Sequence, residues 1–427
     1  MKRTFLKRTF LKITFLLILL MTIIATTVIY ANTTSSGMAC TLLSTERGGI
    51  VSEGRRAMTN AKETYDSFGY STNSLENPSP LLILSNAASS KVQLYCCHGN
   101  PSVLEFPSGG LTVGNSFVSS GKEFNSINGV NWTNAKLVTL AACNTAGYGS
   151  SQTGSLAHQI MSKGAQMTIG WYTEVNPYSM PDWLDNFHTE LDNGYDPLAA
   201  INRASNNYSY FNPNVRNASF WYNSISTLSD DNFELMANTD INSSNAVVSD
   251  KNILSINEMG NMEIAQVENK IKEINPNFNV EDYEKTYTEG LYVFNNNTKE
   301  MKHMNSYINY KLKIGDFITN YEYSVIIDGN GKVQQIVDFT DKDYSYSQLN
   351  NMKNSPTNTV TANDTNVYLQ RARENIQNQE DILEEEIDFF YDLENNKKLA
   401  IVTLRIKDDI LGDKLETYTY NINNSIY

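Results

Sequence analysis

The sequence predicts an α/β protein with a mainly parallel sheet flanked by helices, followed by α+β modules built from helices and hairpins. Two patterns predict this arrangement. In residues 33–230, short apolar runs alternate with helical patterns, which is typical of a parallel sheet covered on both faces. After residue 256 the runs lengthen and polar and apolar residues alternate, which is typical of antiparallel strands. The length of 427 residues also favours more than one hydrophobic core.

The elements of the first part follow from these patterns. We expect strands over residues 37–45, 90–97, 111–114, 135–143 and 165–172. We expect helices over residues 51–70, 155–164, 180–194 and 197–208. In the first helix Met58, Ala61 and Tyr65 recur at helical spacing, and Ser52 is the expected N-cap.

The C-terminal half has a different organisation. Residues 231–255 are polar and weakly periodic, so we expect a linker there. The elements expected after it are helices over residues 262–274 and 361–386 and strands over residues 305–314, 318–328, 331–339, 399–406 and 415–422. Residues 328–332 predict a hairpin turn, because Gly and Asn tolerate positive φ.

An internal repeat relates two stretches of this half. Residues 310–327 align with residues 402–422 so that Leu312 lies over Leu404, and the second copy ends where the first continues into a further strand. The predicted domains are therefore residues 33–230, a first module over residues 256–345 and a second module over residues 363–427.

The N-terminus predicts export. Residues 1–12 carry five positive charges and no acid, and residues 13–30 form an apolar or Thr-containing run of 18. Ala31 and a polar stretch follow, so residues 1–31 are predicted to be a signal peptide cleaved after Ala31. The alternative is an uncleaved membrane anchor, because a run of this length is near the lower limit for a spanning helix. We expect a secreted or extracellular protein, or one at a bacterial cell surface, with membrane contact only if the segment stays uncleaved.

The composition excludes nucleic-acid partners and contains no metal-binding pattern. The net charge is −14, whereas binding to phosphates needs clustered Lys and Arg. The four His are scattered and no C-x-x-C pair occurs, so we expect no metal and no cofactor. The cysteines are Cys40, Cys96, Cys97 and Cys143, and their spacing leaves a disulfide between Cys40 and either Cys96 or Cys97 open.

Two predicted strand ends carry reactive side chains. The strand over residues 90–97 is followed by His98 and Gly99, and the strand over residues 135–143 ends at Cys143. The carboxyl ends of neighbouring parallel strands meet at one edge of a sheet, where catalytic groups gather. There the imidazole can take the thiol proton and later protonate a leaving amine. The N–H groups of Gly99 and Cys143 are the candidate oxyanion hole.

A structural interpretation stands beside the catalytic one. A cysteine at a strand end is most often part of the core, and a histidine before glycine is most often a turn residue. Their coincidence in a chain with few Cys and His favours the pair. The other histidines, His158, His188 and His303, are expected to be packing or surface residues, and Cys96 and Cys97 lie within a strand.

The sequences around these two strand ends resemble those of the caspase-like cysteine peptidases, clan CD. The likeness is carried by residues 94–100 (LYCCHGN) and 137–147 (LVTLAACNTAG), and it continues through residues 154–175 and 187–204. Within the clan the CHAT peptidases are most similar, with the gingipain type next. The resemblance covers roughly residues 38–215 and implies a caspase-like fold.

The resemblance also implies roles for individual residues. By it, His98 is the general base, Cys143 the nucleophile and Gly99 an oxyanion contributor in a cysteine-type endopeptidase, or thiol protease. Members of the clan often cut after a charged residue. Arg47 would suit an acidic substrate side chain, and Glu174 would suit a basic one, although both are equally readable as solvated loop charges.

The C-terminal repeats resemble PepSY-type modules, small helix-and-hairpin domains often found beside exported peptidases, most clearly over residues 323–339. The expected function is therefore that of an exported cysteine endopeptidase that hydrolyses protein or peptide substrates through an acyl-enzyme. The C-terminal modules are expected to act as an intramolecular inhibitor, kept close by a short tether and released by cleavage in residues 231–255. The alternative function is that of a catalytically inactive, caspase-like secreted binding or adhesion protein. For the modules themselves, the alternative is that they bind a wall or a partner and have no regulatory role.

Overall fold

The computed structural model describes residues 37–46, 51–147, 154–222, 253–254, 266–295, 298–340, 344, 346–355 and 358–422. The predicted signal peptide, Arg47 and all of the predicted linker except Ile253 and Leu254 lie outside these ranges. Within the ranges described, no helix has both the length and the apolar character that crossing a membrane requires.

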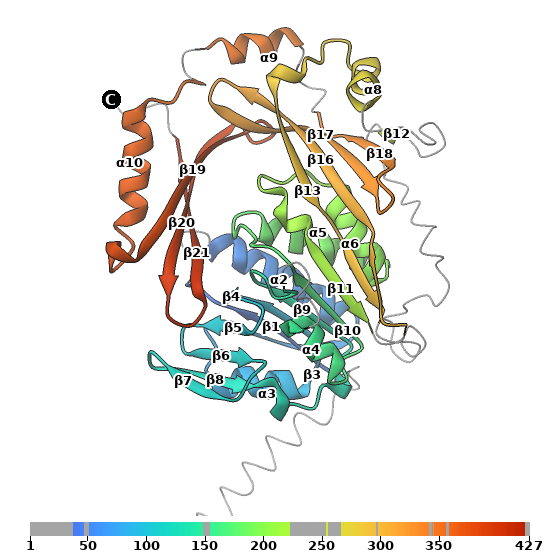
Figure 1. Ribbon diagram of the computed structural model, residues 1–427, viewed down its shortest axis with the longest axis vertical. Helices are drawn as coiled ribbons and strands as arrows, with labels where there is room; N and C mark the ends of the chain where they lie inside the picture. The colour runs from blue at the N-terminus through green and yellow to red at the C-terminus, as the bar shows by residue number, and fades with distance from the viewer. Residues whose placement is uncertain are drawn as a thin grey trace, which may run out of the picture.

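The predicted α/β class is confirmed by an eight-stranded mixed sheet (Figure 1). Its strands, in spatial order, are β15 (Glu300–His303), β14 (Tyr292–Asn295), β11 (Ala218–Tyr222), β10 (Met167–Trp171), β9 (Leu137–Ala141), β3 (Ser90–Cys96), β1 (Gly37–Leu43) and β2 (Tyr70–Glu76). The neighbouring strands β10, β9, β3, β1 and β2 are all parallel to one another, whereas β11 is antiparallel to β10. Every residue of β9 and β10 is buried, which explains their nearly unbroken apolar sequences.

Helices cover both faces of this sheet. On one face α2 (Val51–Ser67), α5 (Met180–Asp192) and α6 (Pro197–Asn206) share a hydrophobic cluster with the strands, and on the other face α3 (Pro80–Ser89) and α4 (Leu156–Ser162) share a second. Tyr65 and Trp183 fill the first cluster, and Trp132 and Ile160 fill the second. The four helices predicted here are present, but Ser52 lies inside α2 and is not its cap.

A small five-stranded sheet follows β3 in the chain. Its order is β4 (His98–Gly99), β5 (Val103–Phe106), β6 (Gly109–Thr112), β8 (Lys122–Ser126) and β7 (Phe117–Ser119). The strand predicted over residues 111–114 corresponds to β6, two residues earlier. The other strands are too short to show a periodic signal, so the sequence pattern did not reveal them.

The C-terminal half forms a second sheet. The first part of this half contains the helix α8 (Val267–Ile274). It also contains the strands β13 (Tyr283–Glu289), β16 (Asn305–Ile314), β17 (Phe317–Asp328) and β18 (Val333–Asp338), with β12 (Ile253–Leu254) beside β18. After α9 (Tyr346–Lys353), its second part contains α10 (Ala362–Arg373), β19 (Ile382–Asp392), β20 (Lys397–Asp408) and β21 (Gly412–Asn421). A helix, a short 3₁₀ turn and three antiparallel strands thus occur twice, and the aligned stretches of the repeat fall on β16–β17 and β20–β21.

The helix predicted over residues 361–386 is only half right. It is capped by Thr361 and ends at Arg373. From Ile382 onward the chain forms β19, which pairs along its length with β20. This pairing overrides the helix preference of the consecutive glutamates at residues 384–386.

The two halves of the molecule share hydrogen-bonded strands. The hairpin β14–β15 lies between β13 and β16 in the sequence, yet β14 joins the N-terminal sheet by pairing in parallel with β11. In the C-terminal sheet β17 pairs in parallel with β19, where Ile318 lies opposite Phe390. The two C-terminal copies therefore form one continuous sheet.

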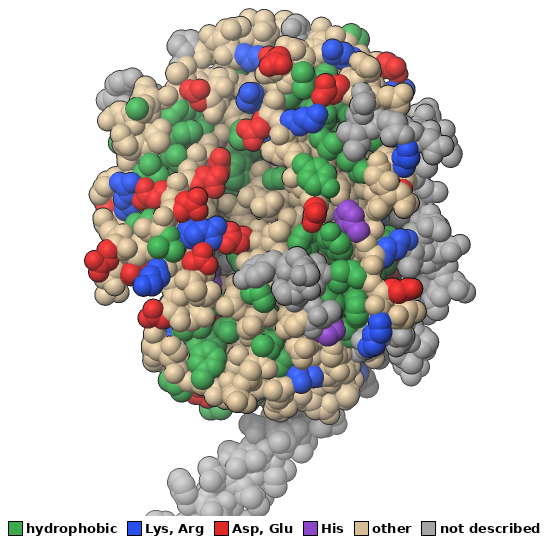
Figure 2. Space-filling view, in the orientation of Figure 1, with side chains coloured by type: hydrophobic (Ala, Val, Ile, Leu, Met, Phe, Trp, Pro, Cys, Tyr) green, Lys and Arg blue, Asp and Glu red, His purple; other side chains and the backbone are tan. Residues whose placement is uncertain are grey.

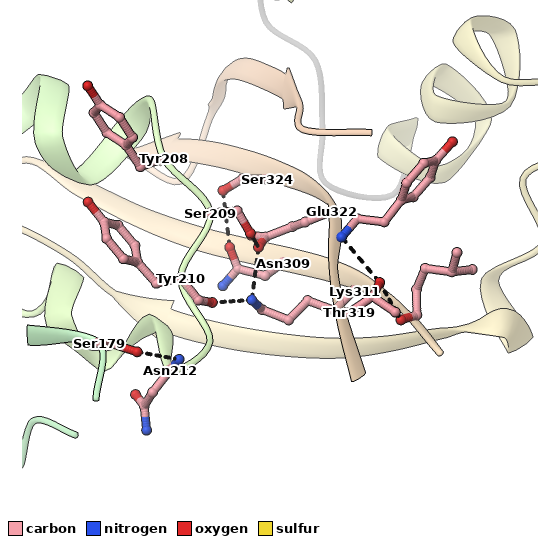
Figure 3. Close-up of polar contacts among 12 residues, drawn as sticks. Ser179, Tyr208, Ser209, Tyr210, Asn212, Asn309, Lys311, Thr319, Glu322 and Ser324 are labelled. Carbon is pink, nitrogen blue, oxygen red and sulfur yellow. Dashed lines mark hydrogen bonds and ion pairs between the residues drawn. The ribbon is translucent and has the colours of Figure 1, made fainter. Parts of the chain in front are cut away.

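A buried ion network also joins the halves, and Figure 3 shows its centre. Glu322 on β17 accepts a hydrogen bond from Ser209 at 2.6 Å and pairs with Lys311 at 3.0 Å. Arg216 lies 3.6 Å from Glu322 and donates to the Tyr208 carbonyl at 2.7 Å. Burial alone would raise the pKa of Glu322, but the charges of Lys311 and Arg216 outweigh burial and lower it.

Candidate active site

The carboxyl ends of β3 and β9 carry the two candidate catalytic residues. The strands are adjacent and parallel, and Cys96 on β3 lies opposite Ala141 on β9. His98 and Cys143 each stand two residues beyond this pair. The N–H of Cys97 donates to the Ala141 carbonyl at 3.4 Å, so the two chains remain side by side past the last paired residues. The two side chains therefore emerge at the same edge of the sheet.

His98 is held by a third strand end. Its side chain is 6% exposed, and its Nε2 is hydrogen-bonded to the backbone carbonyl of Glu46, which follows β1. Because a carbonyl only accepts, Nε2 carries the hydrogen, and Nδ1 of the neutral ring is left as the proton acceptor. Glu46 thus orients the candidate base. No sequence pattern indicates this role, because the backbone carbonyl of any residue could fill it.

Cys143 is partly exposed, unlike the other cysteines. Its thiol donates to the Val175 carbonyl at 3.7 Å, and the N–H of Asn144 donates to the Thr173 carbonyl at 3.0 Å. Asn144 has a positive φ of 56°, so the chain turns sharply after the candidate nucleophile. The segment that follows β10 therefore runs directly beside Cys143, and Glu174 lies in the middle of this segment.

Gly99 is required by close packing at this edge. A Cβ atom at this position would lie 2.9 Å from the Ala142 Cβ and 3.2 Å from the Val103 carbonyl oxygen. Glycine therefore lets the chain after His98 approach the residue that precedes Cys143. This closeness supports the assignment of the Gly99 backbone to the candidate oxyanion hole.

The other cysteines are buried and reduced. Cys40 lies opposite Gln93 on β3, whereas Cys96 lies opposite Leu43, three residues further along β1. This offset is on the order of 10 Å, beyond the reach of a disulfide. No disulfide joins Cys40 to Cys96 or Cys97, so the disulfide alternative for Cys40 is wrong. Burial raises the pKa of Cys40 to about 12, which makes it unreactive.

The remaining histidines lie in other parts of the structure. His188 accepts a hydrogen bond from Tyr65 at 3.0 Å, and burial lowers its pKa to about 4. The ring of His158 packs against Trp221, and His303 lies on β15. None of the three is at the edge where β3 and β9 end.

The hairpin β20–β21 extends from the C-terminal sheet down to the small sheet near β4 and β5 (Figure 1). At its tip Leu411 packs with Val103 and Phe124 of the small sheet, and its carbonyl accepts from the Asn100 side chain at 3.5 Å. Higher on β20, both Nη atoms of Arg405 donate to the Glu174 carboxylate, one of them at 2.6 Å. The hairpin thus contacts the segment that follows His98 and the segment after β10 that runs beside Cys143. The sequence did not single out this hairpin.

An acidic cavity lies beside this hairpin. Its volume is about 460 Å³, and it lies between β13, β19, β20 and residues 211–214. The charged residues that line it are Glu174, Glu284, Glu384, Glu386, Asp388 and Arg405. Figure 2 shows acidic side chains gathered next to the hollow of this face. Burial raises the pKa of Asp388 to about 7, and the carboxylates of Glu386 and Glu284 add to the rise.

Within the part of the chain that the structure describes, no group of three or more His, Cys, Asp or Glu side chains is arranged to hold a metal ion. Comparison with protein-family models and with curated protein sequences found no match to this chain.

Proposed function

We propose that this chain is an exported cysteine endopeptidase with a caspase-like fold, in which Cys143 is the nucleophile and His98 the general base. The register of β3 against β9 carries the proposal, because it brings the two strand ends to one edge of the sheet. The hydrogen bond from His98 to the Glu46 carbonyl supports it, since it fixes the imidazole in the tautomer that can accept a proton at Nδ1.

The reaction is an acyl transfer to sulfur. The Cys143 thiol gives its proton to His98 Nδ1, and the sulfur forms a bond with the carbonyl carbon of the substrate. The carbonyl oxygen takes up negative charge beside the N–H groups of Gly99 and Cys143. The C–N bond then breaks as His98 returns the proton to the leaving amine, which leaves a thioester. Water loses a proton to His98 and hydrolyses the thioester, and the proton returns to the thiol.

Export and restraint belong to the same proposal. The charged and apolar character of residues 1–31 supports export. The contacts of the hairpin β20–β21 with Asn100 and Glu174 support a role of the PepSY-like C-terminal modules as an intramolecular inhibitor. Cleavage within residues 231–255 would leave the halves associated through β11–β14 and the network around Glu322. Activation therefore requires the hairpin itself to leave the site.

Substitution in the full-length chain tests the proposal. With a peptide library as substrate, Cys143→Ala should abolish hydrolysis. His98→Ala should lower its rate by about 100-fold or more, because the thiol loses its base. Cys97→Ala is the matched control and should retain most activity. Circular dichroism checks that each variant is folded.

Two outcomes contradict the proposal. Equal loss of activity in Cys97→Ala and Cys143→Ala would reject the assigned nucleophile. If neither the wild-type chain nor an Arg405→Ala chain, which lacks the hairpin contact with Glu174, cuts any peptide, and a thiol-reactive peptide probe labels Cys143 in neither, the chain is an inactive binding protein.

A further inference from the structure

We infer that Glu174 is the specificity carboxylate of this site, that it selects a basic side chain in the substrate, and that Arg405 occupies it in place of the substrate. The inference rests on the proposed function, because it assigns the residue preference and the restraint of the same active site. It is carried by the contact between Arg405 and Glu174 and by the position of Glu174 beside Cys143.

Glu174 lies in the segment after β10, between two residues whose backbone carbonyls contact the candidate nucleophile and its neighbour. The carbonyls of its two neighbours, Thr173 and Val175, accept hydrogen bonds from Asn144 and Cys143 respectively. The Glu174 side chain is 34% exposed even with Arg405 bound, so it opens to solvent once the hairpin leaves. A carboxylate in this position attracts a cationic side chain and disfavours an acidic one.

Arg405 meets Glu174 in the geometry of substrate recognition. Each of its two terminal nitrogens donates to a different carboxylate oxygen, a two-pronged contact that is specific for a guanidinium. Asp413 at 2.8 Å and Glu384 at 3.2 Å hold the other sides of the guanidinium. Both of these acids belong to the hairpin's own module, so Arg405 is positioned by β19 and β21 and presented to Glu174.

The backbone around Arg405 is not available for cleavage. Arg405 lies on β20, opposite Glu384 on β19 and opposite Leu415 on β21. Because β20 is paired on both sides, its peptide groups are committed to the sheet and cannot bind as an extended substrate. Arg405 therefore imitates a substrate with its side chain alone, and its backbone remains in the sheet. The hairpin thus acts as an inhibitor and is not cleaved.

A second contact holds the tip of the hairpin against the small sheet. Leu411 at its tip is 7% exposed and packs with Val103 and Phe124, on the side of the site that carries His98. With Arg405 on Glu174, the hairpin is anchored on both sides of the edge where β3 and β9 end. Each anchor raises the effective concentration of the other, so a modest ion pair is enough to exclude a substrate.

The test compares full-length variants on peptides that differ only in the residue before the cut: Arg, Lys, Asp or Ala. Arg405→Ala should hydrolyse the Arg and Lys peptides about tenfold faster than wild type or more, because the competing guanidinium is gone. Arg405→Lys keeps the charge but loses the two-pronged contact, so its hydrolysis rate should lie between those of wild type and Arg405→Ala. Arg373→Ala is the matched control. It removes a similar arginine–carboxylate pair, Arg373 with Glu385, inside the second copy.

Adding Glu174→Gln to the Arg405→Ala chain should slow hydrolysis of the basic peptides by about 10- to 100-fold more than hydrolysis of the Ala peptide. A second measurement is independent of catalysis. Agmatine, a small guanidinium compound, should bind the Arg405→Ala chain at least about tenfold more tightly than wild type, and Glu174→Gln should remove this binding.

Equal hydrolysis and equal agmatine binding by wild type and Arg405→Ala would overturn the inference, as would faster cleavage of the Asp or Ala peptide than of the basic ones. If no variant hydrolyses any peptide but agmatine binding follows Glu174 and Arg405 as described, the peptidase assignment fails and the basic-side-chain site stands.

Discussion

At the residue scale, the candidate base and nucleophile are held differently. His98 is almost fully buried and tied to the Glu46 carbonyl, whereas Cys143 keeps contact with solvent. A fixed base next to an accessible sulfur is the arrangement that nucleophilic catalysis needs, because the ring must stay oriented while the sulfur meets a substrate. Three neighbouring strands, β1, β3 and β9, contribute Glu46, His98 and Cys143 in turn.

Asp388 gives the molecule a pH-dependent stability. Its folded pKa of about 7 is raised above the ordinary value of 3.8, so between these values the folded chain holds a proton that the unfolded chain has released. The stability from this group is complete at low pH and is lost as the pH rises towards 7. Asp388→Asn should therefore raise the free energy of unfolding at pH 8 relative to wild type by about 1–2 kcal/mol, after allowance for solvent screening, and have little effect near pH 4.

Thermal or urea unfolding at pH 4 and pH 8 measures this difference. Asp409→Asn, an exposed residue of the same module, is the matched control and should behave as wild type at both values. An Asp388→Asn chain that gains no stability at pH 8 would show that burial, together with Glu386 and Glu284, does not raise the pKa of Asp388 as described.

At the element scale, the sequence identified those elements whose burial leaves a local pattern. The strands β3, β9 and β10 are buried on both faces and show it as apolar runs, which is how His98 and Cys143 could be placed at strand ends. The hairpin turn at residues 328–332 was also predictable, and Gly331 has the positive φ of 79° that such turns need.

Other elements depend on partners that are distant in the sequence. Residues 382–386 became part of β19 because β20 pairs with them, although their glutamates favour a helix. The hairpin β14–β15 belongs to the C-terminal half in sequence but pairs with β11 in the N-terminal sheet. The hairpin β20–β21 contacts the region of the candidate site through Arg405 and Leu411. The sequence indicated that Glu174 could bind a basic side chain, but only the structure shows that the guanidinium of Arg405 binds it.

At the scale of the whole molecule, the two halves are joined by a buried charge network. Arg216, Lys311 and Glu322 have side chains that are 0%, 3% and 1% exposed. Taking these charges out of water is costly, and one carboxylate balances both cations. The balance of charge within this network therefore depends on a single residue, Glu322.

Glu322→Gln should lower the free energy of unfolding by about 3–5 kcal/mol, because it leaves Lys311 and Arg216 buried without their counter-ion. Glu268→Gln is the matched control. Glu268 pairs with Lys285 at 3.0 Å on the surface, so its loss should cost less than about 1 kcal/mol. Urea unfolding followed by tryptophan fluorescence measures both variants. Similar small losses in the two would mean that the network does not hold the halves together.

Alkylation with iodoacetamide measures whether His98 activates the Cys143 thiol. The full-length chain is alkylated at neutral pH under reducing conditions, and each modified cysteine is located by mass spectrometry. We expect Cys143 to react ahead of the buried Cys40, Cys96 and Cys97, and His98→Ala to slow this reaction by at least about tenfold because the thiol loses its base. An unchanged rate at Cys143 in the His98→Ala chain, or modification of Cys97 ahead of Cys143, would show that His98 and Cys143 do not act as a catalytic pair.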